Sequence, residues 1–132
     1  MANYEVEAQG NIQNCVITCG ARVGYEGDRE VSLDEVIVIL GAAHKEVAAD
    51  NILIPIPCIV REGTLVGRSE GMDYTEKVYS FNFARSPRLP EISDEVFEKS
   101  IYGYAFRLGE KMGQEKVYLD YKGRTTVFRI VE

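Results

Sequence analysis

The sequence predicts an α+β fold with the element order βαββαβ and a sheet order of 4-1-3-2. Two segments with helical periodicity, each opened by a serine, alternate with segments rich in β-forming residues. No helix joins the second and third strands, which argues against a doubly wound parallel sheet. Two prolines place the second strand at an edge, where the order 4-1-3-2 also puts it. This is a ferredoxin-like sandwich, to which the sequence adds a C-terminal hairpin strand.

The first predicted strand is NCVITC, residues 14–19. Upstream, YEVEA (4–8) alternates apolar and acidic residues, which allows a short additional N-terminal strand. Ser32 and Glu35 have the spacing of a capping box, so a helix is expected to start at residue 33. Its core positions recur at helical spacing: Val36, Leu40, Ala43 and Val47.

The second predicted strand is ILIPIPCIV (52–60). Pro55 and Pro57 lack N–H groups on the same side of this strand, so no neighbour can pair there. A polar segment with a small ribbon around TLVGR (64–68) follows, and then EKVYSFNFA (76–84), whose alternation and length suit a central strand.

The second predicted helix opens at Ser93, with Asp94 and Glu95 in its first turn, and ends near Gly113. The last segments, KVYLDY and TTVFRI, flank a Lys-Gly turn and predict a terminal hairpin.

Composition limits the classes of function. The 132 residues are expected to form a single domain, residues 1–132, because one core suffices at this length. The net charge of −6 disfavours duplex nucleic acid and acidic membranes as partners. The sequence has no apolar segment of about 18 residues and no signal-like start, so we expect a cytoplasmic location. Cys15 and Cys19 would lie about 13 Å apart on one strand, which predicts free thiols rather than a disulfide or a metal site.

Two loops carry the candidate site residues. The predicted sheet has the strands that precede these loops adjacent and parallel, so we expect both loops and both helix N-termini to meet. The expected ligand-binding residues are Arg22 and Tyr25 in the first loop and Arg85, Ser86 and Arg88 in the second. Arginines near helix N-termini bind carboxylates or phosphates, which predicts a small anionic, nucleotide-like ligand. The alternative is that these arginines neutralise neighbouring carboxylates.

The glycine-rich stretch GARVGYEG (20–27) matches neither the P-loop nor the dinucleotide-binding spacing. Its glycines are better explained as turn residues.

The sequence also offers few candidate catalytic residues. His44 is the only histidine, and a dyad with Cys58 would require proximity that the sequence does not indicate. We therefore expect no catalytic residues, no metal and no cofactor.

GYEG followed by SLDEV, the loop RSPRLPEIS and the stretch MGQEKV together resemble a group of short phage and bacterial proteins. The resemblance spans roughly residues 15–120. It implies no reaction, but it suggests a phage or mobile-genome setting, in which small acidic proteins that counter host defences are common.

The favoured functional prediction is a non-catalytic binding module that forms homo-oligomers and captures a small anionic ligand or a partner protein. Self-association is expected because the helix from residue 33 carries apolar residues on more than one face. The alternative is a small enzyme acting on a phosphodiester or a nucleotide.

Overall fold

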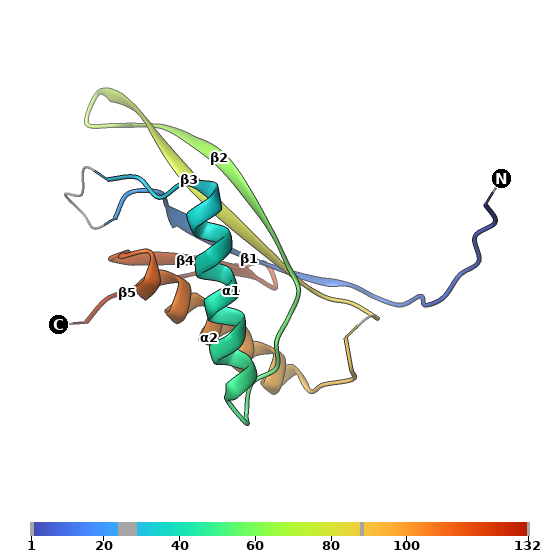
Figure 1. Cartoon of the computed structure of the whole chain (residues 1–132). Helices are drawn as coiled ribbons and strands as arrows, with labels where there is room; N and C mark the ends of the chain where they lie inside the picture. Colours follow the sequence, from blue (N-terminus) through green and yellow to red (C-terminus); the bar gives the residue numbers. More distant parts are fainter. Residues whose placement is uncertain (1, 24–28, 88, 132) are drawn as a thin grey trace.

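The computed structural model describes residues 2–23, 29–87 and 89–131. Within these ranges the chain forms two helices and one antiparallel sheet of five strands. The elements are β1 (Gln13–Gly20), α1 (Leu33–Ala49), β2 (Cys58–Ser69), β3 (Met72–Arg85), α2 (Asp94–Lys111), β4 (Lys116–Tyr121) and β5 (Arg124–Arg129). The two helices pack beside each other against the sheet (Figure 1). The predicted α+β class is confirmed.

The strand order is β2-β3-β1-β4-β5. The predicted ferredoxin-like order 4-1-3-2 is therefore not matched as it stands, because β5 adds a fifth strand to the sheet beside β4. The terminal hairpin of β4 and β5 is confirmed, and its turn residues Lys122 and Gly123 both have positive φ angles, 53° and 70°. Because β5 pairs with β4 along its whole length, it is a full member of the sheet.

Both predicted helix starts are confirmed by their caps. The Ser32 side chain accepts a hydrogen bond from the N–H of Glu35 at 3.2 Å, and the Ser93 side chain accepts one from Val96 at 3.1 Å. Each cap satisfies an N–H group that has no partner inside the helix. Among the described residues, neither helix has the combination of length and apolar character needed to cross a membrane.

β2 lies at the sheet edge as predicted, but the prolines are not part of it. The strand begins at Cys58, after Pro57. The N–H groups of the preceding segment are bonded to α2 instead: Ile54 donates to Ser100 Oγ at 3.0 Å and Ile56 to the Tyr104 hydroxyl at 3.1 Å. The prolines alternate with these two residues, so this segment follows the helix without leaving unpaired donors.

β2 and β3 form one long hairpin, in which Ser69 pairs with Met72 and Cys58 pairs with Phe83. The predicted ribbon and central strand are parts of this single hairpin. The possible N-terminal strand is not formed. Residues 2–12 have no strand structure, and they run away from the sheet (Figure 1).

The core lies between the helices and one face of the sheet. Cys15, Ile17 and Cys19 of β1 alternate into it, as do Tyr79, Phe81 and Phe83 of β3. The predicted core positions of α1 are all buried. The opposite sheet face, which no helix covers in the described chain, carries Thr18 and Gly20 of β1 and the even-numbered residues of β3. Polar side chains on this open face are therefore accessible to a ligand.

Candidate functional site

The sequence predicts that the two arginine loops meet, but in the structure they lie at opposite ends of the sheet. β1 and β3 are adjacent but antiparallel: Gln13 pairs with Arg85, whereas Gly20 pairs with Val78. Arg22 and Arg85 therefore lie near opposite ends of β1, about 30 Å apart at about 3.3 Å per strand residue. The assumption of parallel strands was wrong because β3 returns directly from β2 through a hairpin and so reverses direction.

Arg85 is held by contacts within the fold. Its guanidinium donates to Asp94 and to the carbonyl oxygen of Ile92, and to Gln13 Oε1 at 3.3 Å. It also lies over the ring of Phe97, 5.6 Å from the centroid. These contacts join the start of α2 to the ends of β1 and β3.

An open groove of about 570 Å³ lies beside Arg85, and Ser86 contributes to its lining. Tyr25 and Arg88, the other two predicted ligand-binding residues of the loops, lie outside the described residues. Arg22 forms a β-bridge with Glu30, far from this groove. Ligand binding by these residues stays a prediction, but Arg22 and Arg85 cannot contact one small molecule.

The opposite end of the sheet holds a more connected polar cluster, which we call the glycine-loop end: Gly20, Arg22, Glu76, Lys77 and Gln114. Gln114 is its connecting residue. Its Oε1 accepts a hydrogen bond from the N–H of Gly20 at 3.0 Å. Its Nε2 donates to the carbonyl oxygen of Arg22 at 2.6 Å and to that of Met112 at 3.0 Å. One amide thus fixes the end of β1 against the loop after α2.

A carboxylate lies directly against this backbone. A Cβ atom placed on Gly20 would be 2.7 Å from Glu76 Oε1 and 3.2 Å from Gln114 Oε1, so a larger residue would require the ends of these side chains to move. Glu76 and Gly20 belong to the open face of the sheet, because Gly20 pairs with Val78, two residues from Glu76. Tyr118 of β4 is on the same face, and its side chain is 43% exposed.

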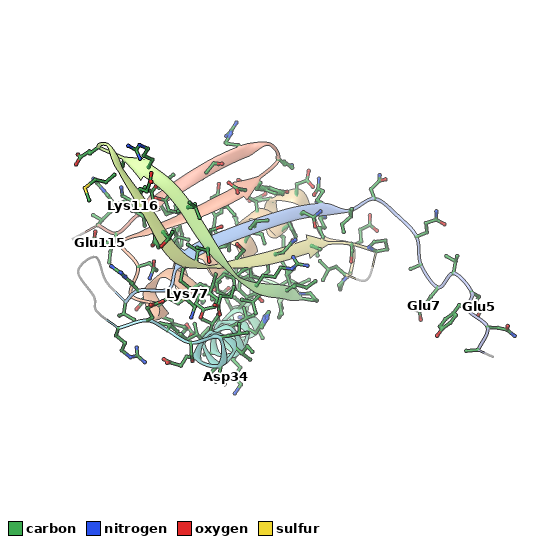
Figure 2. The ribbon with its side chains drawn as sticks, turned by 90° about the horizontal axis from the view of Figure 1, so that it is seen from above. Glu5, Glu7, Asp34, Lys77, Glu115 and Lys116 are labelled. Atoms are coloured by element: carbon green, nitrogen blue, oxygen red, sulfur yellow. The ribbon has the colours of Figure 1, made fainter. Side chains whose placement is uncertain are left out.

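Further charged residues surround this end. Lys77 Nζ lies 3.6 Å from Glu62 Oε1. Partial desolvation lowers the pKa of Lys77, but Tyr79 and the carboxylates of Glu62 and Glu30 outweigh it, so the net pKa is raised and the ammonium stays charged. Figure 2 shows Lys77, Glu115 and Lys116 at this same end of the sheet. Glu62 pairs with Tyr79 in the register and so lies on the helix side with Lys77, whereas the exposed Glu76 lies on the open face beside Gly20.

The remaining reactive side chains serve the fold. The Tyr104 hydroxyl lies 2.6 Å from His44 Nδ1, and it accepts the N–H of Ile56. Burial lowers the pKa of His44, so its ring is neutral near pH 7. Burial also raises the pKa of Cys58 to about 12, which makes its thiol a poor nucleophile. The described chain contains no group of three or more metal-ligating side chains.

No protein-family model matches this sequence, and no curated protein matches it. Two solved structures match nearly its whole length. One is a phage SAM lyase in complex with S-methyl-5'-thioadenosine, with a TM-score of 0.61, 19% identity, and coverage of 98% of this chain and 97% of the other. The second is a phage SAM lyase in the apo state, with a TM-score of 0.60, 19% identity, and coverage of 99% and 97%. The chain shares the fold of these structures.

This comparison overturns the favoured functional prediction. The solved structures that share the fold over the whole chain are those of an enzyme, not of a non-catalytic binding module. The alternative from the sequence, a small enzyme acting on a phosphodiester or a nucleotide, is better supported than the binding module. Sequence reasoning also missed Glu76 and Gln114. The stretch MGQEKV contains Gln114, but only the strand register brings it to Gly20.

Proposed function

We propose that this chain is a lyase that cleaves S-adenosylmethionine and releases S-methyl-5'-thioadenosine, with its site at the glycine-loop end. The observation that carries the proposal is the match of the fold, over almost the full length of both chains, to a SAM lyase that binds this thioether. The polar cluster around Gly20 supports the location, because it places fixed side chains beside an open sheet face.

The charge of the site suits this substrate. S-adenosylmethionine carries a sulfonium, an ammonium and a carboxylate, so it is a net cation at neutral pH. The glycine-loop end presents Glu76 on the open face of the sheet, on a chain whose net charge is −6, while Glu62 and Glu30 lie near Lys77 on the helix side. The proposed substrate is still nucleotide-like, as the sequence predicts. It is a net cation, however, and not the anion that the sequence predicts.

The proposed reaction requires little from the protein. The carboxylate of the substrate attacks its own γ-carbon, the bond from that carbon to sulfur breaks, and the sulfur keeps the electron pair. The products are the neutral thioether and homoserine lactone, and no water, proton or oxidant is consumed. No general base is needed, which agrees with a chain whose one histidine is hydrogen-bonded to Tyr104.

Charge is lost at both reacting groups in this step, so removal of water from the sulfonium and the carboxylate favours the reaction. A protein carboxylate beside the sulfonium would stabilise the substrate more than the transition state. We therefore place Glu76 against the ammonium of the substrate, whose charge does not change. Its role is then to bind and orient the substrate.

The test is to incubate the purified chain with S-adenosylmethionine in water enriched in ¹⁸O and to analyse the products by mass spectrometry. We expect the thioether and an unlabelled lactone. Glu76→Gln should lower kcat/KM by at least about tenfold, the range of one lost charge-assisted contact. Glu62→Gln serves as the matched control. A folded parent chain that forms no thioether contradicts the proposal, while vinylglycine as co-product would replace lactone formation by elimination.

Two predictions from the sequence stay proposals. Ile37 and Val38 of α1 are 52% and 72% exposed, which supports self-association through this helix. Light scattering should give a particle heavier than the 14.8 kDa chain, and a particle of that mass would contradict self-association.

The second proposal is a role against host defences. Cleavage of a host's S-adenosylmethionine would deprive the host's methyl-transferring enzymes of their methyl donor, which fits this role.

A further inference from the structure

Residues 2–12 form an extended arm: Gly10 and Asn11 lie beside the loop at Pro87, and the part before them runs away from the sheet (Figure 1). Tyr4 is 94% exposed and Val6 is 76% exposed. Glu5 and Glu7 alternate with them and lie far from the sheet (Figure 2). The arm contains two carboxylates and no lysine or arginine. This alternation of apolar and acidic residues is typical of a strand that pairs on one edge and buries one face.

The β5 edge has the complementary properties. β5 carries Arg124 and Arg129 and no carboxylate, and as the last strand of the sheet it has one side free for pairing. Next to it, Phe106 of α2 is 53% exposed and packs edge-on against Phe128 of β5, with ring centroids 5.0 Å apart. An exposed aromatic pair at an unpaired edge is a surface that a further strand would cover.

The β2 edge fits the arm less well. β2 contains Arg61 and Arg68 but also Glu62, so its charge is mixed. The segment before β2 is bonded to α2 through Ile54 and Ile56. Charge complementarity therefore favours β5 as the edge that an acidic arm pairs with.

The arm cannot easily reach the β5 edge of its own chain. β4 and β5 separate β1 from that edge, and a strand added there would lie about 14 Å from β1 at about 4.8 Å per strand. For Glu7 to pair with Val127, which is level with Thr18 because both pair with Tyr118, the chain would also have to run about 16 Å along β1 from Gln13, a total of about 22 Å. The six steps from Gln13 back to Glu7 span at most about 21 Å, and the chain must also reverse direction. A second copy has no such limit.

We propose that the arm of one copy pairs with β5 of a second copy as a sixth, antiparallel strand. A register with Glu5 opposite Arg129 puts Val6 opposite Phe128 and Tyr4 opposite Ile130. The two apolar arm residues then lie on the helix side, where they cover Phe106, and the two carboxylates lie on the open face beside Arg129. The exchange is reciprocal when two copies pair about a twofold axis.

The first test uses charge reversal in two separate chains. One variant carries Glu5→Arg with Glu7→Arg, and the other carries Arg129→Glu with Val127→Glu, the positions opposite Glu5 and Glu7 in this register. Each alone should associate at least about tenfold more weakly than the parent, because like charges face each other. An equal mixture should regain the affinity of the parent, since every arm then meets an edge of opposite charge.

A single chain that carries all four changes tests the alternative, in which the arm pairs with β5 of its own chain. If the arm folds back on its own chain, this combined variant regains protection of arm amides in hydrogen exchange, while the mixture of the two separate variants does not. That result would overturn the proposal. Unchanged association of both separate variants would overturn it as well.

A second test is independent of any other self-association of the chain. A Glu5→Cys chain is mixed with an Arg129→Cys chain under mild oxidation, and disulfide-linked pairs are measured on a non-reducing gel. The control replaces the edge variant by Ser69→Cys, at the exposed turn of the other hairpin. We expect the mixed dimer only with Arg129→Cys, and equal yields in both mixtures would contradict the pairing.

Discussion

The side chain of Gln114 accepts the N–H of Gly20 at 3.0 Å, and so joins the loop after α2 to the end of the central strand. Because the same amide also donates to the carbonyl oxygens of Arg22 and Met112, its loss would leave three backbone groups without this partner at once. The geometry of the glycine-loop end depends on this one residue.

Gln114→Ala should lower the free energy of unfolding by about 1 to 2 kcal/mol, because the N–H of Gly20 loses its partner in a partly buried position. Urea unfolding followed by circular dichroism measures the change. Glu115→Ala, at the exposed neighbouring position, is the control and should change it by less than about 0.5 kcal/mol. Equal effects of the two changes would contradict the connecting role.

Gly20→Ala should affect the proposed cleavage more than stability. The new methyl group would meet Glu76 Oε1 and Gln114 Oε1, and both side chains must move to accommodate it. Gly63→Ala is a matched control, because its Cβ would make only an ordinary contact, 3.8 Å from Val78 Cγ2. Formation of S-methyl-5'-thioadenosine is the measurement. If both variants keep the activity of the parent, the reaction takes place elsewhere.

Tyr104→Phe should lower the free energy of unfolding by about 1 to 3 kcal/mol, because the buried N–H of Ile56 is left without a partner. Tyr102→Phe, on the same helix but half-buried, should cost less. Thermal and urea unfolding of the two variants can be compared directly. A smaller effect at Tyr104 than at Tyr102 would show that the hydroxyl does not hold the segment before β2.

Stability should decrease as pH falls through the range in which a free histidine titrates. Burial lowers the pKa of His44 in the folded chain, so the unfolded chain binds more protons at these pH values. The contribution is complete above the unfolded pKa, near 6.5, and is lost as pH falls toward the lower folded pKa. Unfolding measured between pH 8 and about 5 should show a slope that His44→Asn removes. A slope that persists in the variant must come from other groups.

Arg85→Ala should destabilise the chain by about 1.5 to 3 kcal/mol, because this guanidinium bonds two carbonyl-type oxygens and a carboxylate within the fold. The sequence predicted Arg85 as a ligand-binding residue, whereas the structure gives it these contacts within the fold. Arg61→Ala on the exposed side of β2 is the comparison. If the two variants unfold at the same urea concentration, the contacts of Arg85 contribute nothing measurable.

The parts of the fold that depend on local signals were predictable. Ser32 and Ser93 start their helices through bonds within three residues, and the Lys-Gly turn forms through backbone preferences at Lys122 and Gly123. Strand 2 was placed correctly at an edge, but Pro55 and Pro57 lie before it, because α2 supplies hydrogen-bond partners that a linear pattern does not reveal.

The candidate site was less predictable because it depends on strand direction. Treating the first and third strands as parallel joined Arg22 to Arg85, whereas the antiparallel register places Glu76 next to Gly20. Nothing local in the sequence links Gln114 to Gly20, since almost the whole chain separates them. With the correct strand directions, the sequence would have placed Glu76 beside Gly20 and so indicated this end of the sheet as the candidate site.

The position of β1 between β3 and β4 has a consequence for synthesis on the ribosome. β1 leaves the ribosome first, but β3 follows only after α1 and β2, and β4, whose Tyr121 pairs with Cys15, follows only after α2 as well. The apolar residues of β1 must therefore wait for nearly the whole chain, which at about 5 to 20 residues per second takes many seconds. During that time the nascent strand is open to chaperones and to pairing with other chains.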